Sequence, residues 1–282
     1  MSHQVRDIIF RSLITKFAPQ KKERLLSFWP SLENINTQES GVNCAFEKNL
    51  LEMVHYSWFL PALKECDKEL LALYIAAFPD HAQKRLQALL QTKLSTLELT
   101  NLARQYLTEL LSQKITSPEL LPITFLPKDA LLDLVNASKE ELLQLIDALG
   151  IYDLAAAMPT IVDAQLLKAI NKFLTIKKRP FFNYLLKKKP KPLFSDLTFD
   201  ERPTDNNIYL TLHSKGLIRL ALALSDSNKS LVWYIAHILD HGRGEILIKL
   251  SEKKPQEKTY QIILKNIAEA QGFLKAGKES AP

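Results

Sequence analysis

A helix-pair pattern that recurs along the chain constrains its fold more than any other feature. The apolar residues between Leu166 and Leu185 match those between Leu231 and Leu250 at one constant offset. A third stretch, from Leu70 to Leu89, fits the same spacing, and each stretch is broken by charged, Pro or Gly residues after the same position. Copies of one helical unit are typical of stacked helical repeats, which present surfaces that bind other proteins.

The composition favours the same fold class. The chain has 282 residues but only 7 glycines. Because a glycine in a helix interior costs about 1 kcal/mol relative to alanine, a low glycine content favours helices. We predict an all-α protein of stacked, armadillo-like helical repeats with a short N-terminal amphipathic extension. The alternating run from Ile208 to His213 is compatible with a strand, but we favour the start of a helix.

We predict four segments along the chain. Residues 1–41 hold an amphipathic helix, with Val5, Ile8, Ile9, Leu13 and Phe17 on one face, and a polar linker. Residues 42–126 form a first helical domain, which ends in a proline-rich stretch. Residues 127–194 form a second repeat, and residues 195–282 form a third repeat with a C-terminal tail.

Three glycines are predicted to mark helix ends. Ser138 and Glu141 form a capping-box signature, and Gly150 is expected to terminate the helix that they begin. Gly216 is expected to open the next helix. Gly242 is expected to stop a helix at His241.

The sequence indicates no chemistry of its own. His237 and His241 have a spacing that can chelate a metal, but Ile238 stands where a zincin needs glutamate, and no third ligand is evident. His55 and Ser57 lack the glycines of a nucleophile elbow. We therefore predict no catalytic residue, no metal and no cofactor, and a protein that is not an enzyme.

Two groups of residues are candidates for binding a partner. The first is the aromatic cluster His55, Trp58 and Phe59, which is interpreted either as core or as a partner anchor, for which tryptophan is favoured. The second is a basic stretch that carries much of the formal net charge of +6. It is either a solvated surface or a patch for an acidic partner, nucleic acid or anionic lipid. Its members are Lys177, Lys178, Arg179, Lys187, Lys188 and Lys189.

Cysteine usage and hydropathy predict a cytoplasmic protein. The two cysteines, Cys44 and Cys66, form no CxxC motif, which fits a reducing compartment. The N-terminus lacks the apolar core of a signal peptide, and we find no apolar run long enough to span a bilayer.

Two stretches resemble the helical repeats of the FliG family of flagellar motor-switch proteins. His55 falls on the histidine of the family's Glu-His-Pro-Gln motif, and Ala77-Phe78-Pro79 falls on its Leu-Pro turn. Val54 replaces the glutamate and Tyr56-Ser57 replaces Pro-Gln, so the surface made by that motif is altered. The stretch from Leu131 to Leu186 is similar to a later repeat of the same family. We find no match to the family's charged torque helix.

The resemblance implies an adaptor role rather than a rotary motor. Without a torque helix, a FliG-like chain is expected in the related injectisome, as a sorting-platform adaptor of the SctK family and of the chlamydial type. It would bind secretion-ring or sorting-platform proteins at the inner face of the cytoplasmic membrane. Two alternatives stay open. One is a nucleic-acid-binding repeat protein that uses Lys177–Lys191, and the other is a helical protein bound to anionic membrane surfaces.

Overall fold

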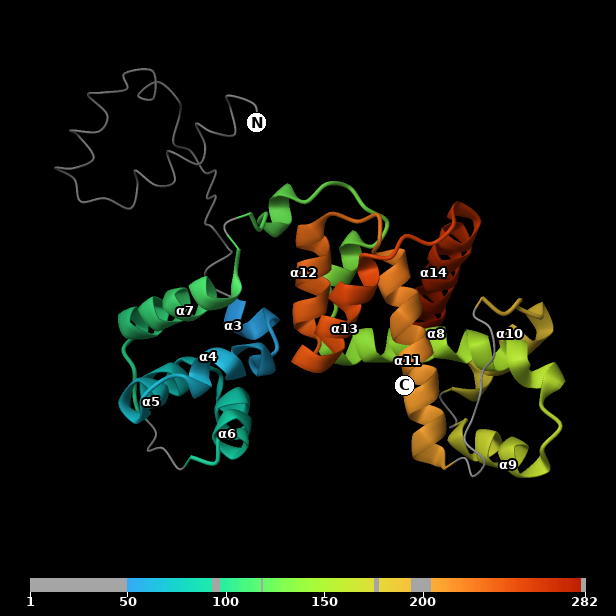
Figure 1. Cartoon of the computed structure of the whole chain (residues 1–282), viewed down its shortest axis with the longest axis horizontal. Coiled ribbons are helices and arrows are strands. Elements are labelled where there is room, and N and C mark those ends of the chain that lie inside the picture. Colours follow the sequence, from blue (N-terminus) through green and yellow to red (C-terminus); the bar gives the residue numbers. More distant parts are fainter. Residues whose placement is uncertain (1–49, 93–96, 118, 175–177, 194–203, 280–282) are drawn as a thin grey trace, which may run out of the picture.

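The computed structural model describes residues 50–92, 97–117, 119–174, 178–193 and 204–279, and every regular element within these ranges is helical (Figure 1). The predicted all-α class is confirmed. The first half contains α3 (Leu50–Met53), α4 (Leu60–Lys64), α5 (Lys68–Ala77), α6 (Asp80–Leu89) and α7 (Asn101–Ile115). The second half contains α8 (Lys139–Ala157), α9 (Ala164–Phe173), α10 (Arg179–Lys188), α11 (Asp205–Ala223), α12 (Lys229–Ile238), α13 (His241–Ser251) and α14 (Glu257–Glu279). Short 3₁₀ turns precede or follow several of these helices: η2 (Tyr56–Phe59), η3 (Ile123–Phe125), η4 (Leu132–Asn136) and η5 (Met158–Thr160).

The described residues form two units, each with its own core. In the N-terminal unit, α3 to α7 enclose a cluster built around Phe59, Phe78 and Leu111, whose side chains are completely buried. In the C-terminal unit, η4 and α8 to α14 enclose a larger cluster that extends from Leu131 to Ala270. The segments predicted at 127–194 and 195–282 therefore share one core. The predicted helix at 5–17 lies outside the described residues.

The predicted helix pairs correspond to pairs of short consecutive helices. The three pairs are α5–α6, α9–α10 and α12–α13. The first helix of each pair begins at an Asp or Asn side chain that accepts a backbone hydrogen bond, namely Asp67, Asp163 and Asn228. The match is imperfect in the first pair, because Leu70 and Leu89 are 37% and 55% exposed rather than buried.

Two 19-residue helices, α8 and α11, cross at the centre of the C-terminal unit (Figure 1). Two glycines let the helices approach closely at this crossing. Gly150 of α8 packs against the backbone of α11, and Gly216 of α11 packs against the backbone of α8. A Cβ atom on Gly150 would lie 2.1 Å from the carbonyl oxygen of Leu212, and one on Gly216 would lie 1.8 Å from that of Ile146. The predictions that Gly150 ends a helix and that Gly216 begins one are wrong. Both glycines lie inside helices because the two backbones touch there.

The crossing is reciprocal. Asp147 binds His213, and Asp153 binds Arg219, with both pairs separated by 66 residues along the chain. The same spacing relates Gly150 to Gly216, and the helix-capping Ser138 to Thr204. Each copy of the helix thus meets its equivalent in the other copy, as subunits do across a two-fold axis. The triplet α8–α9–α10 and the triplet α11–α12–α13 are thus alike in their order, one long helix followed by two short ones.

Candidate functional site

The N-terminal unit is attached to the C-terminal unit at the corner between α12 and α13. The backbone N–H of His55 donates to the carbonyl of His237 at 2.8 Å. The indole Nε1–H of Trp58 donates to the carbonyl of Leu239 at 3.0 Å. The N–H of His241 donates to the Ser57 hydroxyl at 2.9 Å. We call this set of contacts the junction, and it satisfies polar groups at the end of α12 and the start of α13.

Aromatic stacking fills the junction. The ring of His237 lies between the indoles of Trp58 and Trp233, with 3.8 Å between centroids on each side. The rings of His241 and Trp58 meet in an edge-to-face arrangement, with 4.7 Å between their centroids. His237 and His241 belong to different helices, so the prediction that Gly242 stops a helix at His241 is wrong. Asp240 caps α13 instead, by accepting from the N–H of Arg243.

Gly244 makes room for Trp58. A Cβ atom at this position would lie 2.3 Å from the indole ring and 2.5 Å from the carbonyl oxygen of Ala236. Gly242 and Gly244 therefore lie at the start of α13, and Gly244 leaves space for the Trp58 ring of the N-terminal unit. Sequence reasoning missed Gly244 and Trp233 because nothing near them in the chain indicates a contact with residue 58.

His55 is held neutral within the junction. Its Nε2 lies 2.8 Å from the Lys139 ammonium and its Nδ1 lies 2.8 Å from the Ser57 hydroxyl. A charged lysine can only donate, so Nε2 accepts from Lys139. The Nδ1 edge faces Ser57, whose hydroxyl lies 2.8 Å away and whose backbone N–H lies 3.4 Å away. Burial, reinforced by Lys139, lowers the pKa of His55 to about 4.

The partners of His55 differ from those of the histidine in a catalytic triad. In a catalytic triad the histidine lone pair faces the hydroxyl and a carboxylate stabilises the imidazolium. Here Nε2 of His55 faces the Lys139 ammonium, and the Ser57 hydroxyl accepts a hydrogen bond from the N–H of His241. The Ser57–His55 pair serves to join the two units.

A groove of about 650 Å³ opens beside the junction, between α3, η2 and α6 of the N-terminal unit and η4 with the start of α8. Its apolar lining includes Leu51, Val54, Val135 and Ile238, with Met53 and Ile123 half-buried. Exposed charged side chains also line it, namely Glu52, Arg85 and Glu140. Apolar walls with a few charged groups are typical of surfaces that bind amphipathic segments. We call this feature the junction groove.

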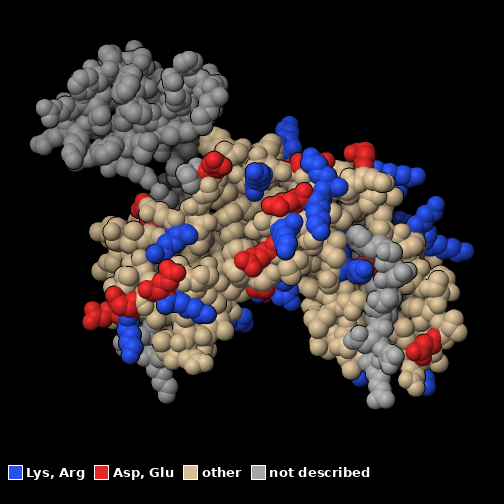
Figure 2. Space-filling model, in the orientation of Figure 1, with Lys and Arg blue, Asp and Glu red and all other residues tan. Residues whose placement is uncertain are grey.

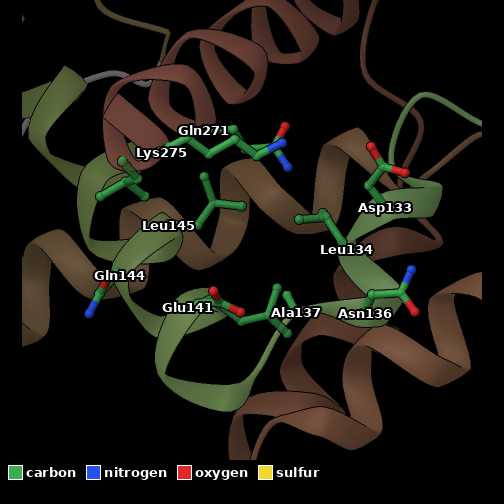
Figure 3. A pocket seen from close by; sticks show the side chains of 11 residues that line it. Asp133, Leu134, Asn136, Ala137, Glu141, Gln144, Leu145, Gln271 and Lys275 are labelled. Carbon is green, nitrogen blue, oxygen red and sulfur yellow. The ribbon is translucent and has the colours of Figure 1, made fainter. Parts of the chain in front are cut away.

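A smaller pocket of about 190 Å³ lies beside the junction groove. It is bounded by η4, the first turns of α8 and the C-terminal part of α14 (Figure 3). In this view Gln271 and Lys275 of α14 lie opposite Glu141 and Ala137. Asn136, Ala137 and Glu141 line both cavities. The turn that leads into α8 is therefore a wall shared by the two cavities.

The aromatic residues predicted to bind a partner lie in two different places in the structure. Phe59 is 0% exposed within the N-terminal core, so the prediction that it anchors a partner is wrong. Trp58 and His55 lie in the junction, where they bind the other unit of the same chain. The core interpretation of Phe59 is correct because η2 turns its side chain against Phe78.

Two basic residues of the predicted patch are bound to carboxylates of the same chain. Lys178 binds Asp147 at 3.0 Å, and Lys188 binds Glu269 of α14, which also accepts from Tyr152 and Tyr184. Arg179 donates to the carbonyl of Asn171, whereas Lys187 and Lys189 are exposed. Lys177 lies outside the described residues. On the face in Figure 2, basic and acidic side chains are intermingled.

Among the described residues no group of three His, Cys, Asp or Glu side chains is placed to hold a metal ion. One helical stretch, Lys139–Thr160, is long and apolar enough to cross a membrane. It contains α8, the helix that α10, α11 and α14 cover in the core. No protein-family model, curated protein or solved structure matches this chain.

Replacing Trp58 with alanine is expected to loosen the junction. The change removes the stack on His237 and the hydrogen bond to Leu239, and large-to-small changes at such sites cost about 3 kcal/mol. Limited proteolysis of the full-length protein should then cleave the connection at residues 116–130 faster. Tyr106→Ala is the matched control, because Tyr106 is 61% exposed on α7. Equal cleavage of both variants would contradict the role given to Trp58.

Stability is expected to fall as the pH is lowered from 7 to 5. Burial lowers the pKa of His237 to about 4 from the ordinary 6.5, so the unfolded chain binds more protons than the folded chain between these values. The loss is confined to pH values below about 6.5 and amounts to about 2 kcal/mol at pH 5 for this histidine. Urea unfolding at both pH values measures it. His237→Gln should lose that share of the pH dependence, and an unchanged dependence would exclude His237 as its source.

Proposed function

We propose that this chain is a non-enzymatic adaptor that binds other proteins through its helical surfaces, with the junction groove as the principal site. The observation that carries the proposal is the groove itself, which lies between two separately cored units and combines apolar walls with exposed charges. An amphipathic helix of a partner fits such a groove, because its apolar face covers the walls and its polar face meets the charges.

The particular complex proposed is a bacterial type III secretion or flagellar-type assembly, at the cytoplasmic face of the membrane. This part of the proposal rests on the FliG-like spacing of the sequence. The all-helical architecture and the paired short helices are compatible with it. The expected partners are secretion-ring or sorting-platform proteins.

The contacts of the basic stretch disfavour the nucleic-acid alternative. Each phosphate contact requires a cation that is available to the backbone of the nucleic acid. Lys178 and Lys188 are engaged by Asp147 and Glu269 instead. The same argument applies to anionic lipid at this patch.

A crosslinking pull-down of the tagged full-length protein from its native cells tests the proposal. The groove variant is Arg85→Glu, and the control is Lys84→Glu, an exposed neighbour on α6 that does not line the groove. We expect a small set of secretion-ring or sorting-platform proteins that is retained by the control and lost by the groove variant. Recovery of nucleic-acid-associated proteins that disappear after nuclease treatment would overturn the proposal.

A further inference from the structure

The junction groove lies where the chain emerges from its N-terminal region. Helix α3 begins at Leu50, and Leu51, Glu52 and Met53 already line the groove. The segment that precedes Leu50 therefore starts its course at the groove wall. Any part of residues 1–49 that has affinity for the groove is tethered next to it.

One part of that region has the features that the groove requires. The sequence predicts an amphipathic helix at 5–17 that gathers Val5, Ile8 and Ile9 with Leu13 and Phe17 on one face. The segment also carries Arg6, Arg11 and Lys16 against a single acidic residue, Asp7. Its apolar face matches the apolar lining of the groove. Its net positive charge complements a lining that holds three carboxylates, Glu52, Glu140 and Glu141, against two cations, Arg85 and Lys139.

Because the N-terminal segment is tethered to the groove, a weak interaction would be enough to keep it bound there. A random coil of the length of residues 18–49 has an average end-to-end distance of about 30 Å. A tether of this length gives an effective concentration on the order of 1 mM. A segment with a dissociation constant of about 0.1 mM would then occupy the groove most of the time.

We propose that the junction groove holds the chain's own segment Val5–Phe17, with its apolar face against Val54, Val135 and Ile238. The intramolecular contact stands apart from the adaptor role. Its regulatory consequence rests on the proposed function, because a partner helix would have to displace the N-terminal segment from the same groove. A partner would then bind the groove only in competition with the N-terminal segment.

Site-specific photo-crosslinking in the purified full-length protein tests the contact without any partner. A benzophenone amino acid placed at Ile9 would lie on the apolar face, whereas one at Asp7 would lie roughly opposite on a helix. We expect Ile9 to crosslink within the monomer to the walls of the groove, chiefly around Met53, Ile123 and Val135. We expect the probe at Asp7 to give little of that product.

A charge reversal provides the second measurement. Glu140→Lys leaves the apolar walls intact and is expected to weaken the contact about fivefold, the equivalent of about 1 kcal/mol. With the effective concentration and dissociation constant given above, occupancy of the groove, and with it the Ile9 crosslink yield, should fall from about 90% to about 65%. Crosslinks from Ile9 to the exposed Leu102 and Tyr106 of α7, or only between molecules, would overturn the proposal. So would crosslinks distributed over the whole surface. Because no partner is present, these results are independent of the pull-down.

Discussion

Replacing Gly216 with alanine is expected to destabilise the protein by about 3 kcal/mol, the upper end of the range for overpacked cores. The added methyl group would lie 1.8 Å from the carbonyl oxygen of Ile146 and 2.9 Å from the backbone nitrogen of Gly150. Backbone atoms cannot move aside as a flexible side chain can. Helices α8 and α11 would have to separate, and the buried residues around the crossing would lose contacts. Chemical unfolding measures the loss.

Gly272 provides the matched control for this prediction. It lies inside α14, and a Cβ atom there would meet nothing within 4 Å. Gly272→Ala is therefore expected to leave stability unchanged or to raise it by up to about 1 kcal/mol, as helix propensity dictates. If both variants were equally stable, the close approach of α8 and α11 would be disproved.

Replacing Arg219 with methionine is expected to cost about 3–5 kcal/mol. Arg219 is 1% exposed and Asp153 is 5% exposed, and the two side chains form a bidentate pair at 2.6 and 3.1 Å. The methionine would leave the Asp153 carboxylate buried without its cation. A thermal or urea unfolding series would show the loss as a large shift in the midpoint.

A double variant separates the loss of the pair from the burial of a lone charge. Asp153→Leu combined with Arg219→Met replaces both partners with apolar groups of similar size. Because an apolar pair often substitutes for a buried ion pair, we expect the double variant to be much more stable than Arg219→Met alone. A double variant as unstable as the single variant would show that the ion pair itself, and not the unpaired carboxylate, accounts for the effect.

The sequence predicted the features of this fold that depend on local spacing. The capping box at Ser138 and Glu141 is present at the start of α8, and the stretch from Ile208 to His213 is helical as favoured. Helix starts are readable because the cap and the groups that it binds lie within a few residues of each other. The same reasoning places α12 after Asn228.

The features that the sequence did not predict depend on contacts between distant residues. A glycine terminates a helix or admits a neighbouring backbone, and the sequence around Gly150 is compatible with both. What decides between them is Leu212, which lies in a different helix. The candidate site shows the same limitation. Phe59 and Trp58 are adjacent aromatics, yet the core encloses one while the other bridges to Leu239.

The reciprocal crossing of α8 and α11 allows a kind of pairing that a homodimer cannot make. In a symmetric dimer of identical subunits, a residue that touches its own equivalent meets an identical side chain. Asp153 would then face Asp153, and Arg219 would face Arg219. Because α8 and α11 are different stretches of one chain, an acid on α8 can face a base on α11. The covalent connection between α8 and α11 thus allows the buried contact between them to be an ion pair, Asp153 with Arg219.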